Sequence, residues 1–318
     1  MRLPIIYFSL LTVCCFSLTA EAQQYNPRYV GPDKENASEK PKASAGETFV
    51  ITQSMPLRVT TPDVPKTFEL FGEKMPLELW DIRERFDREL LVNTYMQGST
   101  AYIIKLMARW MPMIEARLKA NNVPDDFKYL CIAESALQNQ TSRVGAVGFW
   151  QFMPGTAPQY GLHIDHEVDE RYNPEKATDA ACKYLTDAYN KFGNWTAAAA
   201  SYNCGMGGFN SAMNKQGESS FYKLLLPEET MRYIFRIAAL KQILSNPKAA
   251  GFFLQDDDVY KPLNVERMTI TYGIGDLVQF AKNKGTDYKT LKLLNPWLRD
   301  NTFNNAKQRE YTILLPGK

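Results

Sequence analysis

A single glutamate, Glu134, stands among apolar neighbours near the middle of the chain. Phe127, Leu130 and Cys131 precede it at helical spacing, which places all four side chains on one face of a helix. A carboxyl group on a buried face loses solvation, and near the C-terminal end of a helix the dipole also disfavours a negative charge. Both effects raise the pKa of the carboxyl group, as a general acid working near neutral pH requires.

An acid of this kind suits the cleavage of a glycosidic bond, in which the leaving oxygen must be protonated. Most glycosidases pair the acid with a second carboxylate, but the nearest acidic residues, in the segment 165–170, lie in a polar stretch that we expect to be a solvated loop. The substrate must then help, through an N-acetyl group that stabilises the cation or a hydroxyl that replaces water. The alternative for Glu134 is a structural role, paired with a buried arginine or capping a turn.

The segment "VGAVGFWQFMPGTA" that follows Glu134 favours the catalytic interpretation. Its glycines allow the backbone to turn or to approach a ligand closely. Phe149 and Trp150 offer aromatic faces to a sugar ring, and Gln151 offers an amide donor and acceptor. Taken alone, each of these residues is more often explained by core packing.

The elements that must position these residues are expected to be helices. Ser99 or Thr100 should cap the second helix, and Pro112 should kink or split it. Because no strand alternation competes, residues 76–247 are predicted to form one all-α domain. The predicted helices lie within 76–96, 99–122, 124–134, 174–192, 195–205 and 227–244.

The C-terminal part, 248–318, has a different pattern. Its segments "VERMTITY" and "REYTILLP" alternate like strands, and two short helices are expected between them. A β-α-α-β order of this length predicts a small α/β module that is too small to be the catalytic body.

The N-terminus is typical of a secretory signal peptide over residues 1–22. An arginine precedes an apolar run, and a small-x-small sequence at 20–22 would leave Gln23 as the first mature residue. A retained membrane anchor is the alternative. Residues 23–75 are rich in proline and polar residues, at least up to about 66, and are interpreted as a linker or loosely ordered arm. We therefore expect a periplasmic protein, with membrane association as the second option.

The composition argues against several other classes of protein. The net charge is +2 and no run of Lys or Arg stands out, so nucleic-acid binding is not expected. His163 and His166 have no ligand partners at suitable spacing, so neither a metal nor a cofactor is expected. Cys131, Cys182 and Cys204 can form at most one disulfide, and buried free thiols are the preferred interpretation.

Four ordered blocks resemble a known family. They are "AES" at 133–135, "GAVGFWQFMPGTAPQYGL" at 145–162, "ASYNCG" at 200–205 and "ETMRYI" at 229–234. Together they resemble the soluble lytic transglycosylase-like domain, and within it the group of membrane-bound lytic transglycosylase D. The C-terminal module resembles LysM modules, which bind glycans containing N-acetylglucosamine. A cap that no longer binds glycan is the alternative, because the usual glycine before the last strand is missing.

The resemblance implies an all-α, lysozyme-like catalytic domain followed by a small LysM-like α/β module, with peptidoglycan as the substrate. Glu134 would protonate the oxygen between N-acetylmuramic acid and N-acetylglucosamine, and would then take the proton of the muramic acid C6 hydroxyl as a 1,6-anhydro ring closes. The expected partners are peptidoglycan glycan strands, with proteins of cell-wall synthesis as additional candidates. The positions that match the cleft of the family are Ser135, Gly148, Trp150, Gln151, Tyr202, Asn203 and Tyr233.

Two departures from the family concern the fit of a sugar rather than the acid. Ser201 stands where the family usually has Ala, and Phe149 where Leu or Met is common. Two other functions also stay open: a hydrolase of the same bond, as in goose-type lysozyme, and a non-catalytic protein that binds the cell wall.

Overall fold

The structure is a computed structural model, and it describes residues 60–317 of the chain. The predicted signal peptide and the greater part of the predicted arm lie outside these residues. Within the described range, none of the helices combines the length and the apolar character needed to cross a membrane.

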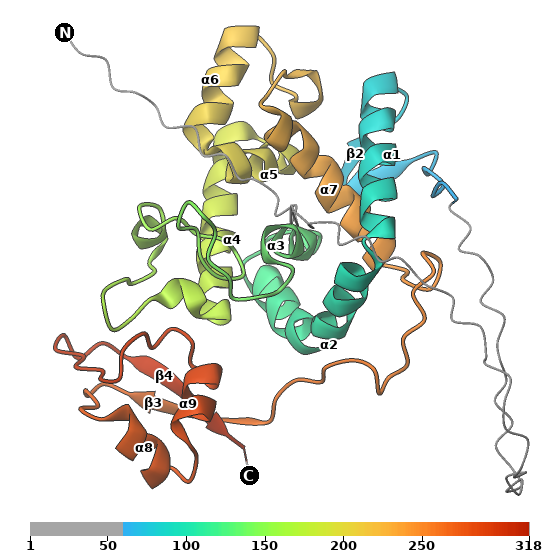
Figure 1. Cartoon of the computed structure of the whole chain (residues 1–318). Helices are drawn as coiled ribbons and strands as arrows, with labels where there is room; N and C mark the ends of the chain where they lie inside the picture. Colours follow the sequence, from blue (N-terminus) through green and yellow to red (C-terminus); the bar gives the residue numbers. More distant parts are fainter. Residues whose placement is uncertain (1–59, 318) are drawn as a thin grey trace, which may run out of the picture. The chain divides into compact units, whose positions relative to one another are not determined.

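The part of the described chain before residue 248 is mainly helical, as the sequence predicts (Figure 1). Short α3 packs against α2 and α7 and lies in the middle of the other helices, so residues on it are largely enclosed. The helices are α1 (Trp80–Tyr95), α2 (Gln97–Ala120), α3 (Phe127–Ser135), α4 (Pro174–Phe192), α5 (Trp195–Cys204), α6 (Met206–Gln216) and α7 (Glu228–Leu244).

The bounds of α4 and α5 follow from capping residues that the sequence predicts. The side chain of Asn173 accepts hydrogen bonds from the backbone N–H of Glu175 and Lys176 at the start of α4. Gly193 ends α4 in the left-handed conformation, with φ of 75°. Asn194 then caps α5, whose alanines at 197–200 are fully buried and allow neighbouring helices to approach closely.

Two predicted helix starts are wrong. Helix α2 begins at Gln97, before Ser99 and Thr100, and the Thr100 hydroxyl donates to the carbonyl of Asn93 at 3.1 Å. Helix α3 begins at Phe127, three residues after Pro124, the first residue of the predicted range 124–134. The proline inside α2 does not split it, and Figure 1 shows the ribbon of α2 changing direction along its length.

A β-hairpin lies within residues that the sequence assigned to the arm. Strands β1 (Phe68–Leu70) and β2 (Glu73–Met75) pair antiparallel, and Leu70 and Met75 are fully buried in the helical core. The folded domain therefore begins before residue 76. Strands of three residues are too short to give a recognisable alternation, which is why the sequence did not indicate them.

The hairpin is fixed to the helices by one carboxylate. Glu73 accepts hydrogen bonds from the backbone N–H of Trp195 at 2.6 Å and of Thr196 at 2.9 Å, and from the Thr196 hydroxyl at 2.6 Å. These N–H groups belong to the first turn of α5, where a negative charge is favourable.

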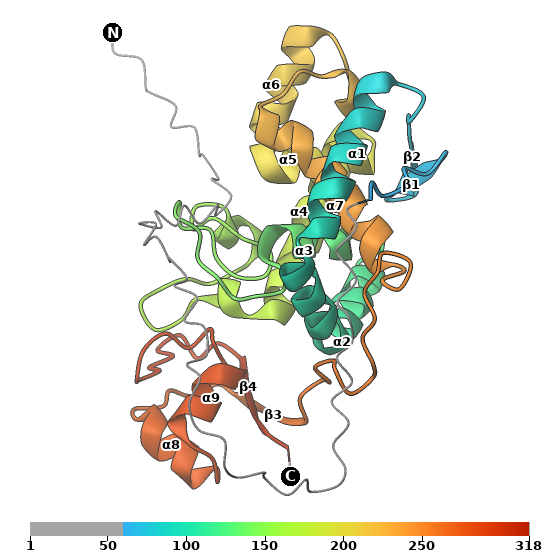
Figure 2. The same cartoon turned by 45° about the vertical axis from the view of Figure 1, so that its right-hand side comes forward.

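The C-terminal part has the predicted β-α-α-β order (Figure 2). Strands β3 (Val265–Ile270) and β4 (Tyr311–Pro316) pair antiparallel, and α8 (Leu277–Asn283) and α9 (Tyr288–Leu294) lie between them in the chain. Its small core includes Trp297 stacked on Tyr311, with ring centroids 5.1 Å apart.

Candidate active site

Glu134 is the second-last residue of α3, at the end that the sequence predicts. Phe127, Leu130 and Cys131 of the same face are fully buried, whereas Glu134 itself is partly exposed. The helix stops directly beyond it because Ala136 and Leu137 take the left-handed conformation, with φ of 51° and 59°. The carboxyl group is therefore enclosed by the core yet still reaches solvent.

The surroundings of Glu134 raise its pKa to about 7. Burial is the largest cause, because it penalises the charged form. A hydrogen bond from Tyr233 and the positive charge of Arg236 act against this shift, and the negative charge of Glu229 adds to it. The carboxyl group is thus partly protonated at neutral pH, in the direction that the sequence predicts.

Tyr233 is the direct partner of Glu134. It comes from α7, is buried, and its hydroxyl donates a hydrogen bond to Oε1 of Glu134. Burial first, and then the charge of Glu134, raise the pKa of Tyr233 well above its ordinary value. The phenol therefore keeps its proton and stays a donor to the carboxylate.

Tyr202 on α5 holds the glycine-rich turn beside the acid. Its hydroxyl donates to the backbone carbonyl of Trp150 at 2.8 Å. Burial raises the pKa of Tyr202 well above its usual range, and the negative charge of Glu134 raises it further. Glu134, Tyr202 and Tyr233 thus form one electrostatic group, drawn from three helices.

The turn itself needs glycine at Gly148. Its φ is +83°, and an added Cβ would lie 2.0 Å from the backbone oxygen of Arg171. Gln151 has a positive φ of 48° without being glycine, and its amide nitrogen donates to the carbonyls of Gly148 at 2.8 Å and Gln140 at 3.1 Å. Backbone strain of this kind clusters at functional sites because the surroundings must enforce it.

Three predicted residues are buried in the core. The Trp150 indole is fully buried and donates to the Thr178 hydroxyl at 2.8 Å, and Phe149 packs edge-on against Trp110. The Ser135 hydroxyl donates to the carbonyl of Cys131 at 3.3 Å. These side chains show core packing, which was the alternative for the aromatic pair, so neither ring offers a face to a sugar.

Asn203 joins α5 to a carboxylate that the sequence did not single out. Its amide nitrogen donates to Oε1 of Glu229 at 3.4 Å, and its amide oxygen accepts from the Thr230 hydroxyl at 2.7 Å. Glu229 is the carboxylate whose charge acts on Glu134. Glu229 is the first residue of the block "ETMRYI", so the block that resembles the family includes it, but that resemblance predicts a role only for Tyr233.

The prediction of a solvated loop at 165–170 holds for the exposed Asp165 and His166, but it is wrong for residues 167–170, which are buried. Asp169 and Arg171 are buried and paired, with 2.7 Å between Oδ2 and Nη2. Arg171 also donates from Nη1 to the carbonyls of Gly145 at 2.9 Å and Phe152 at 3.0 Å. Glu170 is buried against Lys176. Asp169 and Glu170 are each paired with a cation, and the Asp169–Arg171 pair holds the glycine-rich turn.

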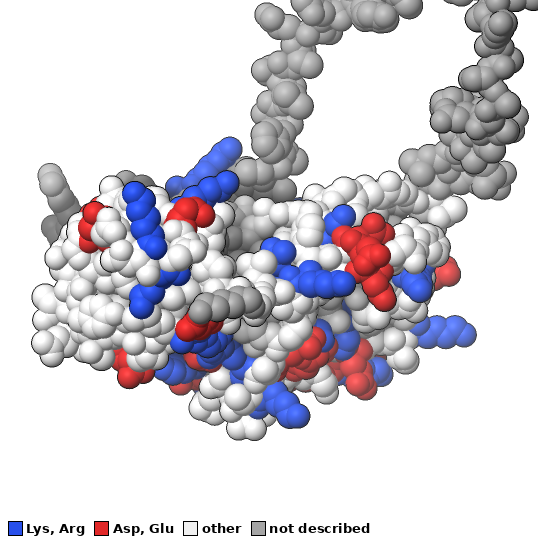
Figure 3. Space-filling model, turned by 90° about the horizontal axis from the view of Figure 1, so that it is seen from below, with Lys and Arg blue, Asp and Glu red and all other residues white. Residues whose placement is uncertain are grey.

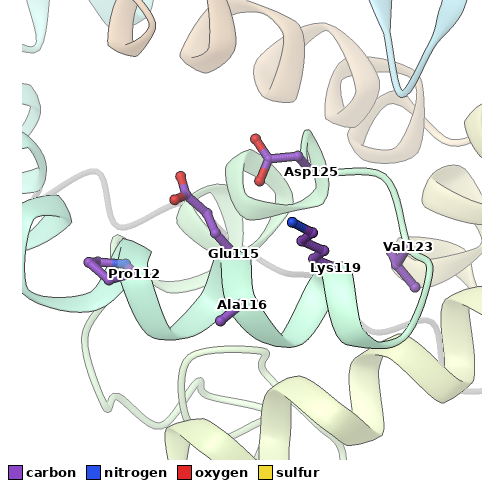
Figure 4. Close-up of a pocket in the computed structure, with 6 residues that line it drawn as sticks. All are labelled: Pro112, Glu115, Ala116, Lys119, Val123 and Asp125. Carbon is purple, nitrogen blue, oxygen red and sulfur yellow. The ribbon is translucent and has the colours of Figure 1, made fainter.

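A pocket of about 450 Å³ lies elsewhere on the domain (Figure 4). It is lined by Pro112, Glu115, Ala116, Lys119, Val123 and Asp125. None of the predicted site residues lines it. Two of its carboxylates are already occupied, because Lys128 pairs with Glu115 at 2.7 Å and with Asp125 at 2.5 Å.

The cysteines among the described residues are free thiols, as the sequence predicts. Cys131 and Cys182 are buried and Cys204 is partly buried. Burial raises the pKa of each, so they are poor nucleophiles at neutral pH.

The fold and the site together define a helical domain with one tyrosine-bound acid, followed by a small β-α-α-β module. Two family models match the chain in the same order. Residues 111–225 match the transglycosylase SLT domain, and residues 266–318 match the soluble lytic transglycosylase C-terminal LysM-like domain. The chain is therefore similar to an SLT domain over 111–225 and to a LysM-like domain over 266–318.

The chain is also similar to curated proteins whose names describe transglycosylases. The chain is 31% identical over 244 residues to "Membrane-bound lytic murein transglycosylase D" of Escherichia coli (strain K12), which covers 74% of this chain and 52% of the relative. The protein of that name from E. coli O6:H1 (strain CFT073) gives the same figures. A stretch of 68 residues is 43% identical to "Peptidoglycan transglycosylase gp16" of Escherichia phage T7, covering 21% of this chain and 5% of that protein. The chain thus spans about half the length of the two E. coli relatives.

Proposed function

We propose that this protein is a peptidoglycan lytic transglycosylase, which cleaves the β-1,4 bond between N-acetylmuramic acid and N-acetylglucosamine and forms 1,6-anhydro-N-acetylmuramic acid. The observation that carries the proposal is the carboxyl group of Glu134, with a pKa of about 7 and a hydrogen bond from Tyr233. The SLT domain match and the names of the relatives support the same substrate.

In the first step, Glu134 acts as a general acid. Its proton passes to the bridging oxygen, and the bond from that oxygen to C1 of the muramic acid breaks with its electron pair on the oxygen. An oxocarbenium-like cation is left on the sugar, and a carboxylate is left on Glu134. The Tyr233 hydroxyl and the charge of Arg236 both favour that carboxylate, so they lower the barrier as it forms.

In the second step, the same carboxylate acts as a base. It takes the proton of the C6 hydroxyl of the muramic acid while the C6 oxygen bonds to C1 and closes the anhydro ring. Glu134 returns to its protonated form and no water is consumed. A pKa close to the working pH serves both steps, since one group must give and then take a proton.

Glu229 is not proposed as a base that activates water. Its charge raises the pKa of Glu134, and its Oε1 is engaged by Asn203. This supports a transglycosylase over a hydrolase, which would need a second carboxylate aimed at the sugar. Gly148 and Gln151 are proposed to contact the glycan, with Tyr202 holding that turn in place through the carbonyl of the fully buried Trp150.

Mass spectrometry of digested peptidoglycan tests the proposal. Muropeptides that end in the anhydro sugar are lighter by one water than those with a reducing end. We expect the anhydro form to dominate with purified protein. Reducing ends alone would establish the hydrolase, and sedimentation with the wall without any release of muropeptides would establish the non-catalytic binding protein.

The location of the protein follows from the same function. We infer a periplasmic enzyme released by cleavage before Gln23, with membrane attachment as the second form, which the words "membrane-bound" in the relatives' names support. N-terminal sequencing of the protein from a periplasmic extract should begin at Gln23. The LysM-like module is proposed to bind glycan strands, and proteins of cell-wall synthesis are candidate partners.

A further inference from the structure

Another buried carboxylate, Glu89, lies on α1, outside the predicted motifs. Glu89 is 1% exposed, and its Oε1 accepts a hydrogen bond from Nε of Arg232 at 2.7 Å. Its Oε2 is buried without a hydrogen-bond partner in the described part of the chain, and the Nε of Arg236 lies 4.0 Å from it. Glutamate is almost never fully buried unless it is paired, so the position calls for a reason.

Both arginines flank the tyrosine that holds the acid. Arg232 directly precedes Tyr233 on α7, and Arg236 lies about one turn further on. Helices α1 and α7 run side by side in both views (Figure 1 and Figure 2). Tyr233 donates to Glu134, and the charge of Arg236 favours the anionic form of Glu134. Arg236 is therefore a cation shared between two carboxyl groups, Glu89 and Glu134.

The other charged groups around this cluster are engaged elsewhere. On α1, Arg85 and Arg88 lie 3.5 Å and 3.0 Å from Glu228 of α7. On α7, Glu229 accepts from Asn203. The other titratable groups that interact with Glu134 are Cys131 on its own helix and Tyr202 on α5, and both are neutral at neutral pH. Among the described residues, Glu89 is the carboxylate within 4.0 Å of Arg236.

We propose that Glu89 is a positioning residue for Glu134: it draws Arg236 away from the catalytic carboxyl group and, through Arg232, fixes the stretch of α7 that carries Tyr233. The inference rests on the proposed role of Glu134. Without the Glu89 charge, Arg236 would be uncompensated and would turn toward Glu134. The anionic form of Glu134 would gain stability, and the general acid would lose its proton at a lower pH.

The pH dependence of muropeptide release tests this, because a general acid works only while protonated. In Glu89→Gln, the alkaline limb of the profile should move to lower pH by about one unit, the size of shift that one nearby cation gives. In Arg236→Gln, it should move to higher pH. The double variant should lie near the wild type, because the charge and its compensation are removed together. Arg88→Gln, which removes an exposed cation of α1, is the matched control and should leave the profile in place.

A uniform loss of activity in Glu89→Gln, with the limb unmoved, would overturn the proposal, since a purely structural role predicts that result. If Glu89→Gln does not fold, Arg236→Gln decides, and an unmoved limb there would also overturn it. Titration of the Glu134 carboxyl carbon by NMR in the wild type and in Glu89→Gln needs no activity. A lower pKa in the variant would support the positioning role even if no anhydro product is found, so failure of the proposed function stays distinguishable. An unchanged pKa would reject the role.

Discussion

At the scale of the residue, the site depends on how one carboxyl group keeps its proton. Burial of Glu134 outweighs the hydrogen bond and the cation that favour its charged form, and the result is a pKa of about 7. Because the acid step needs the protonated form, wild-type activity should fall as the pH rises through about 7. The rate of muropeptide release between pH 5 and pH 9 measures this limb.

Replacement of Glu134 by Gln should abolish activity with the fold retained. The amide keeps the shape of the side chain and cannot donate a proton as an acid, so the rate should fall at least about 100-fold. Turbidity clearing of purified peptidoglycan measures the loss, and circular dichroism checks the fold. Glu115→Gln, at the pocket of Figure 4, is the matched control. Wild-type activity in Glu134→Gln would remove the basis of the mechanism.

Tyr233→Phe should move the alkaline limb to higher pH. The lost hydrogen bond favoured the carboxylate, so without it the pKa of Glu134 rises, by about one unit for a bond to a charged group. The maximal rate should also fall, because the carboxylate formed in the first step is less stabilised. Tyr189→Phe on α4, whose side chain is more exposed, should change neither quantity. A limb that moves to lower pH in Tyr233→Phe would contradict the assignment.

At the scale of the element, the glycine-rich turn is fixed by its close approach to Arg171. In Gly148→Ala, the new Cβ meets a backbone oxygen at 2.0 Å and the residue must keep a positive φ. We expect a loss of about 3 kcal/mol or more in the free energy of unfolding. Gly145→Ala is a matched control, because its φ is +86° but nothing lies within 4 Å, so only about 1–2 kcal/mol should be lost. Equal losses in chemical denaturation would show that the contact with Arg171 carries no energy.

The helices were predictable because their signals are local. Asn173, Gly193 and Asn194 mark their ends by side-chain and backbone chemistry that is visible within a few residues. The hairpin at 68–75 and α6 were missed, the first because its strands are short and the second because only Phe209 of α6 is buried. Elements held mainly by distant contacts leave little periodicity in the sequence.

The same contrast holds for the candidate site. Glu134 could be found because its apolar neighbours lie on its own helix. The role of Arg171 could not, because its partners Gly145 and Phe152 lie 26 and 19 residues away along the chain. Its pairing with Asp169 falls within a segment whose sequence is that of an ordinary polar loop. Glu89 was likewise hidden, since its partners lie on α7. Pairing across elements decides which charges are buried, and one sequence does not show it.

At the scale of the whole molecule, charge is dispersed on the face shown in Figure 3, where Lys and Arg alternate with Asp and Glu. This fits a net charge of +2. A neutral glycan backbone is recognised by hydrogen bonds and apolar faces rather than by a field of one sign, so the proposed substrate does not require such a field. The titratable groups of the site differ from these surface charges because they are largely buried, and the burial of Glu134 affects the stability of the protein.

A raised pKa at Glu134 means that the active site destabilises the fold at alkaline pH. The folded protein holds the proton more tightly than the unfolded chain, whose carboxyl group titrates near 4.5. The stabilisation by proton binding is therefore complete below about pH 4.5 and is lost as the pH rises through about 7, by about 3 kcal/mol at most. Glu134→Gln does not titrate, so its stability relative to the wild type should increase from pH 5 to pH 8.

Thermal unfolding of both proteins at the two pH values measures that difference. Titrations elsewhere in the molecule are common to both and cancel in the comparison. Glu115→Gln, with a carboxylate already paired to Lys128, should not gain stability as the pH rises. A constant difference between Glu134→Gln and the wild type would mean that Glu134 is ionised in the folded protein at pH 5. It would then have no proton to give at neutral pH, and the acid step proposed for it could not occur.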